Sequence, residues 1–356
     1  MNNWHEWMRQ LLGLIGLPAS LAGSYVNAFI PVARQLYDID PYAILRAVDI
    51  QPEQLAQPGF RLSLYRTFKL LKIAEDVTGD PLVGLRLGQH VQPKSYEVLG
   101  YALMSRSNLQ QAIEQLIRFD ALIWDVGGTR FFREGKFAVL ELNPLYVPWV
   151  PPQAFELAIS GQVAFGRWIT GFEGAPFAVS FRHACRGDHA VYADVFGCDV
   201  LFDAPRNAVI FPEEYLQMPL RYADPTLARI MIGTGQRLME NYRQETNIAN
   251  ETRALICELL PTAQQDMDSV AQRMGMSGYQ LSRRLQGAGY RFPDLVEEVR
   301  QDLAGHYLAS ADLALTDIAF LLGFSEQSAF TRAFKRWTGQ APAHFRRQQL
   351  AESTVA

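Results

Sequence analysis

Basic side chains near the C-terminus form the clearest chemical pattern in this sequence. Three arginines and no acidic residue occur between Ser277 and Arg291, and five basic residues occur with a single glutamate between Glu326 and Arg347. Clustered cationic side chains bind phosphate groups, and the affinity falls as the salt concentration rises. Residues 251–350 contain eleven basic and eleven acidic residues in total, so such binding would depend on where the charges lie.

The elements that must position these side chains occur twice. In each copy, a β-branched residue followed by alanine predicts a short helix, and a glycine predicts its end. Two apolar residues four apart then predict a second helix that packs on a core. The first copy contains Val270, Ala271, Gly275, Leu281, Arg283, Leu285 and Gly289. The second copy contains Ile318, Ala319, Gly323, Phe330, Arg332, Phe334 and Gly339. This order is typical of a helix-turn-helix.

Local signals place the ends of these helices. Ser277 and Ser325 are predicted to cap the second helix of each copy. Pro293 to Ala309 predicts one connecting helix, with the proline in its first turn. About 17 residues at about 1.5 Å rise each span roughly 25 Å. That length would let the two second helices enter successive major-groove segments, about 34 Å apart.

Residues 251–350 resemble the DNA-binding domain of the AraC-type transcription regulators. The resemblance is strongest in the second copy, at Asp317-Ile318-Ala319, Leu322-Gly323-Phe324, Phe330-Thr331-Arg332-Ala333-Phe334-Lys335-Arg336, Gly339, Pro342 and Arg346. It implies an all-α domain that binds double-stranded DNA through two helix-turn-helix motifs joined by a connecting helix. It also implies that base contacts lie near the start of each second helix, the recognition helix.

The side chains that the resemblance places against bases have suitable chemistry. Arginine can bond to guanine, glutamine to adenine, and hydroxyls to either. The implied residues are Tyr279, Gln280, Ser282 and Arg283 in the first copy, and Gln327, Ser328, Thr331 and Arg332 in the second. Any one of them could instead touch only phosphate or solvent. Arg284, Lys335, Arg336 and Arg347 are better suited to phosphate than to bases.

Residues 27–225 predict a mixed α+β domain. Helices are expected over 26–50 with a break at Asp40-Pro41, and over 60–78, 108–123, 151–170 and 188–196. Strands are expected over 129–133, 136–142, 177–182, 200–202 and 208–211. The domain boundary is expected at Asp224-Pro225. Residues 226–250 predict a helix to about Tyr242, with Leu227, Ile230, Met231, Leu238 and Tyr242 on one side, and then a polar linker over 244–250.

The N-terminal segment also resembles a known module. The motifs are Thr78-Gly79-Asp80-Pro81, Gly84-Leu85-Arg86-Leu87-Gly88, Leu99-Gly100-Tyr101-Ala102-Leu103, Asn108-Leu109, Ala112, Phe196-Gly197, Phe202, Ala204-Pro205 and Asn207. They are similar to the arabinose-binding-type N-terminal domain of AraC-type regulators, in its ornithine-regulator-like branch. The resemblance implies a regulatory domain that senses an effector and contributes to dimerisation.

Residues that could bind a small molecule or a metal are scattered in this domain. Aromatic and polar side chains that could line a pocket are Trp124, Arg130, Trp149, Phe155 and Trp168, although ordinary core packing explains each of them as well. His183, Cys185, Asp188 and His189 carry donors that a metal could use, but no second cluster accompanies them. No catalytic or phosphate-loop motif occurs. We therefore expect no enzyme activity, no cofactor and no metal.

Composition limits the remaining possibilities. A formal net charge of −4 over 356 residues argues against general affinity for nucleic acid or membranes. The three cysteines suit a reducing compartment, so a cytoplasmic protein is expected. Residues 1–26 are expected to be a lead-in, because the apolar run from Leu11 to Leu17 is short for a secretory signal. Residues 351–356 are expected to be a tail, and no run is long enough to span a membrane.

The leading hypothesis is a sequence-specific transcription regulator, an activator, whose N-terminal domain senses a small-molecule effector. The expected partners are double-stranded DNA, the effector, a second copy in a homodimer and, by resemblance, RNA polymerase. One alternative makes the N-terminal half a ligand-free dimerisation or partner module. Another makes it an enzyme, or a metal or thiol sensor around His183, Cys185 and His189.

Overall fold

The computed structural model describes residues 20–347, apart from residues 49, 56, 58, 125–127, 144–149, 289 and 310–312. Most of the predicted lead-in, together with Trp149, Gly289 and the tail, therefore lies outside the described residues. These fall into two compact units that divide between Tyr242 and Arg243. No described helix is long and apolar enough to cross a membrane.

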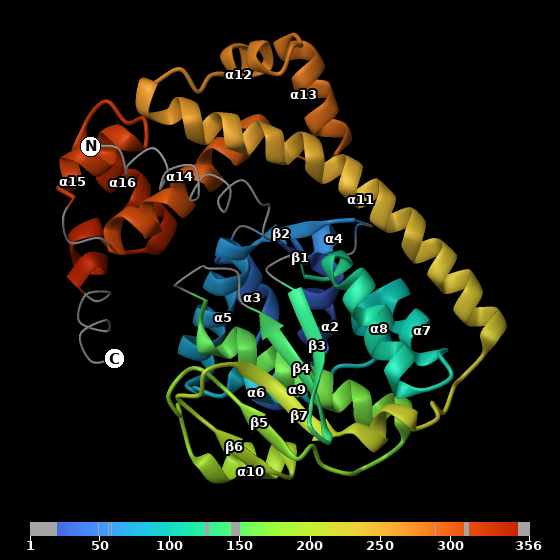
Figure 1. The fold of residues 1–356 in the computed structure, drawn as a ribbon. Coiled ribbons are helices and arrows are strands. Elements are labelled where there is room, and N and C mark those ends of the chain that lie inside the picture. The colour runs from blue at the N-terminus through green and yellow to red at the C-terminus, as the bar shows by residue number, and fades with distance from the viewer. Residues whose placement is uncertain are drawn as a thin grey trace. The chain divides into compact units, whose positions relative to one another are not determined.

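The N-terminal unit contains a five-stranded sheet in the order β3-β4-β7-β5-β6 (Figure 1). Its strands are β3 (Gly128–Glu134), β4 (Phe137–Asn143), β5 (Ala178–Ser180), β6 (Asp199–Leu201) and β7 (Asn207–Pro212). Only β5 and β6 pair in parallel. The predicted hairpin forms between β3 and β4, where Gly135 has a φ of +60° that glycine adopts without strain. A separate two-stranded sheet joins β1 (Ser20–Ala22) to β2 (Arg61–Ser63).

Helices pack against this sheet and against one another to form two cores. The N-terminal helices are α2 (Gly23–Tyr37), α3 (Pro41–Arg46), α4 (Pro52–Leu55), α5 (Leu64–Thr78), α6 (Val83–Gly88), α7 (Glu97–Met104), α8 (Leu109–Phe119), α9 (Pro152–Thr170) and α10 (His189–Phe196). Short 3-10 turns η1 (Pro93–Tyr96), η2 (Asp120–Leu122) and η3 (Glu213–Gln217) link them. Asn108 and Asp188 cap α8 and α10 through their side chains.

Helix α9 joins the two cores because it is apolar on more than one side. Leu157, Phe165 and Ile169 contribute to the helical core, and Ile159 contributes to the core on the sheet. The helix begins at Pro152, where a missing N–H is tolerated, and it ends at Gly171 in the left-handed conformation. This helix therefore lies between the helical layer and the sheet.

The C-terminal unit is helical. It contains the end of α11 (Pro225–Leu259), η4 (Leu260–Thr262), α12 (Met267–Arg273), α13 (Gly278–Gly287), α14 (Phe292–Ala309), α15 (Leu315–Leu321) and α16 (Gln327–Thr338). Helices α12 and α13 form the first predicted helix-turn-helix, α14 is the predicted connecting helix, and α15 and α16 form the second. The predicted fold class, an α+β domain followed by an all-α domain, is confirmed.

Several predicted boundaries differ from the structure. Arg61–Ser63 form strand β2, so the helix expected from residue 60 begins at Leu64. The polar segment 244–250, expected to be a linker, is helical and belongs to α11. The compact units divide between Tyr242 and Arg243 and not at Asp224-Pro225, because Ala228 is buried and Met239 packs into the N-terminal core.

The side of α11 that packs on its own domain was also predicted incorrectly. Ile230 and Leu238 are 55% and 40% exposed. The face that packs on the N-terminal core carries Met239 and Ile232, together with Tyr242 of the predicted stripe. Gly235 allows this approach, because a Cβ there would lie 2.8 Å from the Phe119 ring. Gly233 and Gly235 interrupt the apolar residues of α11, so the sequence periodicity did not identify one apolar face.

Candidate nucleic-acid interface and ligand cavity

The first helix-turn-helix is held by a small apolar core and by two side-chain caps. Val270, Ala271, Leu281 and Leu285 are fully buried. Asp266 caps α12 by accepting the Ser269 amide at 2.9 Å. Ser277 caps α13 as predicted, in a reciprocal capping box with Gln280.

The second helix-turn-helix has the same plan with a larger, aromatic core. Ile318 and Ala319 of α15 are fully buried, as is Phe330 of α16, and Phe334 and Trp337 are nearly so. Ring centroids of Phe330 and Phe334 lie 5.7 Å apart in an edge-to-face arrangement. The predicted Ser325 cap is wrong, because α16 begins one residue later and Glu326 occupies the N-cap position without a side-chain capping bond.

Helix α14 is fastened to the second motif by polar bonds. The Arg300 guanidinium donates to the Leu322 carbonyl at 2.9 Å and to the Gly323 carbonyl at 3.1 Å. Glu297 Oε1 accepts from Trp337 Nε1 at 2.6 Å and from Arg336 at 2.5 Å. These bonds satisfy the carbonyls where α15 ends, and they tie α16 to the connecting helix. The 18 residues of α14 span about 27 Å at the usual helical rise.

The residues predicted to contact DNA lie where a duplex could reach them. Ser282 and Thr331 are half-buried, and the other ten are exposed: Tyr279, Gln280, Arg283, Arg284, Gln327, Ser328, Arg332, Lys335, Arg336 and Arg347. All except Arg347 lie on α13 or α16, opposite the apolar residues that anchor each helix. Both recognition helices therefore present polar side chains outward.

The two copies differ in how far these side chains are already bonded. Arg332 lies 3.4 Å from Glu326 Oε1 and 3.3 Å from Ser328 Oγ, and Ser328 also donates to Glu326. Within the described part of the chain, Arg283 of the first copy makes no hydrogen bond or ion pair. Its guanidinium is therefore the more available of the two for DNA.

Other predicted contact residues have intramolecular partners as well. Gln280 Oε1 accepts from the Ser277 backbone N–H at 2.9 Å, and Gln327 Oε1 accepts from the Thr316 hydroxyl at 2.9 Å. Either glutamine would have to release this bond to bond to adenine in a bidentate manner. Arg336 pairs with Glu297, which leaves Arg284, Lys335 and Arg347 as phosphate-binding candidates with no such pair among the residues described.

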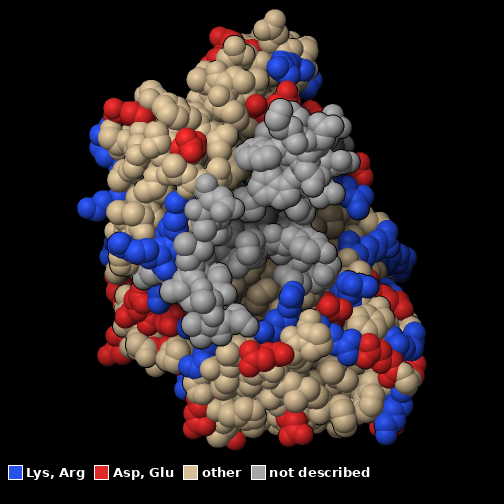
Figure 2. All heavy atoms as spheres, turned by 60° about the vertical axis from the view of Figure 1, so that its left-hand side comes forward, with Lys and Arg blue, Asp and Glu red and all other residues tan. Residues whose placement is uncertain are grey.

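Charge on the molecular surface is mixed. On the face drawn in Figure 2, acidic and basic side chains are interspersed and do not form separate fields of one sign. This distribution agrees with the formal net charge of −4. The basic side chains named above on the recognition helices are therefore the candidates for DNA affinity, since this face shows no broad basic surface.

Each of the two units matches a known protein-family domain. A helix-turn-helix domain matches residues 270–348. The arabinose-binding domain of AraC transcription regulators, an N-terminal domain, matches residues 39–220, which is more than half of the chain. The protein belongs to the AraC-type transcription regulators. It is a DNA-binding regulator and not an enzyme.

Named relatives of this AraC-type regulator align along most of its length. The ornithine utilization regulator of Pseudomonas aeruginosa is 28% identical over 91% of this chain and 95% of its own. The regulator VirS of Mycobacterium tuberculosis is 30% identical over 86% of this chain and 91% of its own. The crystal structure of the regulator CdpR from Pseudomonas aeruginosa covers 87% of this chain and 98% of its own, with 22% identity and a TM-score of 0.43.

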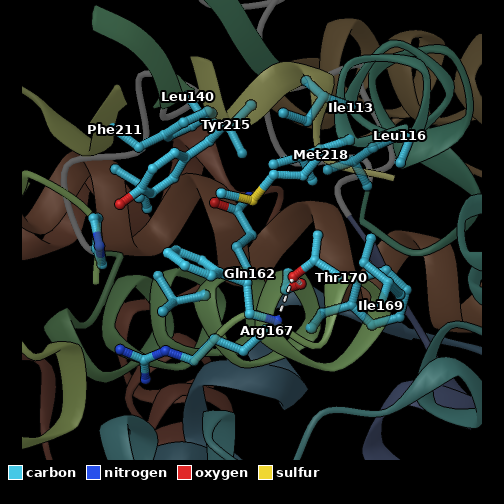
Figure 3. Close-up of a pocket in the computed structure, with 18 of the residues that line it drawn as sticks. Ile113, Leu116, Leu140, Gln162, Arg167, Ile169, Thr170, Phe211, Tyr215 and Met218 are labelled. Carbon is cyan, nitrogen blue, oxygen red and sulfur yellow. Dashed lines mark hydrogen bonds between the residues drawn. The ribbon is translucent and has the colours of Figure 1, made fainter. Parts of the chain in front are cut away.

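The arabinose-binding-type domain of this AraC-type regulator contains a cavity of about 130 Å³. Helices α8 and α9 form one part of its wall, and the sheet and η3 form another (Figure 3). Most of the lining is apolar, as at Ile113, Leu116, Leu140, Ile169 and Phe211. Enclosed apolar cavities with a few polar groups are the usual form of small-molecule sites.

A few polar side chains also border the cavity. Gln162 rises from α9 toward Met218 and Tyr215 (Figure 3). Its Oε1 atom is buried and has no hydrogen-bond partner among the described residues. Thr170 donates its hydroxyl to the Gly166 carbonyl at 2.7 Å. Arg167 donates to the carbonyls of Gly174, Val195 and Phe196 at 3.3, 2.9 and 2.6 Å, so each of its three guanidinium nitrogens donates one bond to the backbone.

None of the described side chains expected to bind a ligand lines this cavity. Trp124 and Trp168 pack against the helical core, and Trp168 also stacks on Tyr222 at 5.1 Å between centroids. Phe155 packs on the sheet core, and Arg130 is exposed on β3. Trp149 lies outside the described residues. The aromatic residues that the sequence analysis chose were therefore a poor guide to this cavity.

The alternative of a metal or thiol sensor is not supported. His183 Nδ1 contacts the Ala184 carbonyl, Cys185 donates to the Gly187 carbonyl, and His189 Nε2 contacts the Val200 carbonyl. The described residues contain no group of three or more histidine, cysteine or acidic side chains that could hold a metal. One atom of each of these three side chains is therefore bonded to a backbone carbonyl, and the three carbonyls belong to different residues.

The same region holds a buried carboxyl group. Glu156 of α9 is fully buried and accepts from the Tyr192 hydroxyl at 2.5 Å, while His183 Nε2 lies 3.8 Å away. Burial raises the pKa of Glu156 to about 7, and the Tyr192 hydrogen bond opposes that shift. Burial also lowers the pKa of His183. Both groups are therefore favoured in their neutral forms.

Proposed function

We propose that this AraC-type regulator is a transcription activator that binds DNA as a homodimer and is controlled by a small-molecule effector. The observation that carries the proposal is the pairing of two outward-facing recognition helices in one unit with a ligand-sized apolar cavity in the other. A regulator that bound DNA without an effector would not need that cavity.

The DNA-binding half of the proposal assigns α13 and α16 to successive major-groove segments. Arg283 and Arg332, with Tyr279, Gln280, Ser282, Gln327, Ser328 and Thr331, would contact bases, and Arg284, Lys335, Arg336 and Arg347 would contact phosphates. The exposure of ten of these twelve side chains supports the assignment. Two monomers on adjacent half-sites would gain affinity through linkage, without new contacts.

The regulatory half requires the effector to bind two states of the protein with different affinities. Recruitment of RNA polymerase in the effector-bound state would then produce activation. The similarity to the ornithine utilization regulator and to VirS supports a regulatory role for the N-terminal unit and leaves the identity of the effector open.

Mapping the DNA bound by the full chain across its genome, followed by footprinting of the recovered sites, tests the proposal. We expect each subunit to protect two adjacent major-groove segments about 34 Å apart, and transcription from the neighbouring promoter to rise with the effector. A footprint without sequence preference at moderate salt would contradict specific binding. Transcription that falls when the regulator is present would contradict activation.

The ligand-free alternative makes a separate prediction. If the N-terminal unit were only a dimerisation module, no small molecule would change DNA affinity or thermal stability, because stabilisation by a ligand requires binding to the native state. The unpartnered Gln162 acceptor inside the cavity favours the effector-controlled reading.

A further inference from the structure

We propose that the cavity between α8, α9 and the sheet binds a small, uncharged ring compound that carries one hydrogen-bond donor. This inference rests on the proposed effector control and names the chemical class of the effector. The central observation is Gln162, a residue that lines the cavity and whose buried Oε1 atom accepts no hydrogen bond from the described residues, so that a small turn of the amide would present this acceptor to a ligand. Buried acceptors in native proteins nearly always have a partner, and a ligand N–H or O–H would supply one.

The size of the cavity limits the ligand. Its volume is about 130 Å³, and an enclosed apolar cavity of about 150 Å³ is known to hold one benzene molecule. A single aromatic or aliphatic ring with a short substituent therefore fits inside the cavity. The aliphatic and aromatic lining, including Ile113, Leu140 and Phe211, gives such a ring apolar contacts on several sides.

The charge of the lining excludes ionised ligands. Arg167 is the cation at the cavity, and its guanidinium already donates to three backbone carbonyls. These three bonds fix the orientation of the guanidinium, so a carboxylate ligand could reach only the two N–H groups that the carbonyls leave over. No aspartate or glutamate occurs among the described residues that line the cavity, so an ammonium group would also be unpaired. Burying an unpaired charge is strongly unfavourable, which leaves an uncharged ligand.

The cavity wall is connected to the start of α11. The Leu109 amide, at the first turn of α8, donates to the carbonyl of the cavity-lining Met218 at 3.1 Å. The chain that follows bonds back to the same region, because the Asp224 amide donates to the Ser105 carbonyl at 3.0 Å. Asp224 then caps α11 through its carboxylate. A ligand that shifts Met218 would therefore act directly on the segment that begins this helix.

Binding of phenol and indole to the full chain, measured by titration calorimetry and ligand-detected NMR, tests the inference. Anisole and N-methylindole are matched probes that lack the donor, and benzoate is a charged probe. We expect phenol and indole to bind about tenfold more tightly than their methylated counterparts, which is the usual effect of leaving one buried hydrogen bond unmade. Benzoate should not bind.

Two substitutions locate the site. Gln162→Leu keeps the volume of the side chain but removes the acceptor, so the preference for phenol over anisole should disappear. Gly166→Leu should fill the cavity and abolish binding of all probes, since a Cβ at Gly166 meets no atom within 4 Å. Gly233→Leu is the matched control, because Gly233 is also helical with open space beside its Cα and lies outside this cavity. Circular dichroism confirms that each variant folds.

The possible outcomes separate the two proposals. Equal affinity for phenol and anisole, tight binding of benzoate, or binding that survives Gly166→Leu would each overturn the ligand class. If no probe binds, the proposed ligand class is also wrong. If DNA affinity then changes with a compound of another class, effector control is still supported. Binding with the expected pattern but without any change in DNA affinity would support the site and contradict effector control.

Discussion

Arg283 and Arg332 occupy equivalent positions in the two motifs but have different surroundings. Glu326 and Ser328 hold Arg332 before DNA arrives, whereas Arg283 extends from α13 without a partner among the described residues. Side-chain hydrogen bonds from Ser328, the largest influence, and from Arg332 keep the pKa of the Glu326 carboxyl below its usual value. An ionised Glu326 could accept from the amino group of cytosine once Arg332 turns to the DNA.

Replacing either arginine by alanine should weaken binding at the cognate site by about 1–3 kcal/mol and relax preference at the bases it contacts. The reason is the loss of a bidentate bond to a base. Fluorescence anisotropy with cognate and scrambled duplexes measures both effects. Arg284→Ala is the matched control, and it should weaken binding to all sequences alike and reduce the salt dependence. Equal losses on both duplexes for Arg283→Ala and Arg332→Ala would mean that these residues contact only phosphate.

Glu156 makes stability depend on pH. Its pKa rises from 4.5 in the unfolded chain to about 7 in the fold, chiefly because it is buried. Between these values the folded state holds a proton that the unfolded state has lost, so stability falls as the pH rises from about 4.5 to about 7, by on the order of 3 kcal/mol. His183, whose pKa is lowered by burial, has the opposite effect, because stability falls as the pH drops through its unfolded value.

The Glu156→Gln variant isolates the carboxyl contribution, because glutamine cannot ionise and His183 is retained. Relative to wild type, the variant should gain stability as the pH rises through this range. Urea unfolding of both proteins from pH 4.5 to pH 7.5 measures the difference. A constant difference across the range would show that Glu156 titrates normally.

Each helix-turn-helix depends on a glycine in the left-handed region at its turn. Gly275 and Gly323 have φ values of +70° and +68°. They differ in their neighbours, because a Cβ at Gly323 would lie 2.8 Å from the Leu260 carbonyl, whereas nothing lies within 4 Å of one at Gly275. The second turn is therefore constrained by packing as well as by its backbone conformation.

Gly275→Ala should destabilise the C-terminal unit by about 1–2 kcal/mol, from backbone strain alone. Gly323→Ala should destabilise it more, because η4 must also move. Hydrogen exchange of the α12–α16 amides in the full chain, compared between the two variants, checks the order. Equal effects would indicate that the segment around Leu260 adjusts freely.

Helix α11 carries an exposed apolar stripe in the N-terminal unit. Ile230 and Leu238, two helical turns apart on one face, are 55% and 40% exposed, and the opposite face packs on its own domain through Met239 and Tyr242. Exposed apolar side chains at this spacing suit helix-to-helix association. They are therefore the residues that we assign to the interface of the proposed homodimer.

Introducing aspartate at both Ile230 and Leu238 should convert the dimer into monomers and weaken binding to paired half-sites. The expected cause is burial of like charges on the two copies. Sedimentation velocity measures the oligomeric state, and Gln236→Asp, an exposed position on the same helix, controls for added charge. A wild-type protein that stays monomeric at micromolar concentration would contradict the assignment, as would a variant that remains dimeric.

The sequence by itself determined the organisation of this protein. Repeated motifs with buried residues such as Leu281 and Phe330 specify two helix-turn-helix units, because helical periodicity and glycine turns are local properties of the chain. The strands and helices of the N-terminal domain followed from the same signals. The candidate DNA-contacting residues were named through the resemblance to AraC-type regulators, and ten of the twelve are exposed in the structure.

Only the tertiary structure decided which side chains meet. The cavity draws residues from α8, α9, β7 and η3, and no local pattern records that these segments converge around Gln162. Local sequence patterns also did not predict the pairing of Arg332 with Glu326 or the bonds from Arg167 to distant carbonyls. The same holds for the exposed side of α11. Periodicity predicts that a residue is buried, but the partner that buries it depends on contacts between segments far apart in the chain.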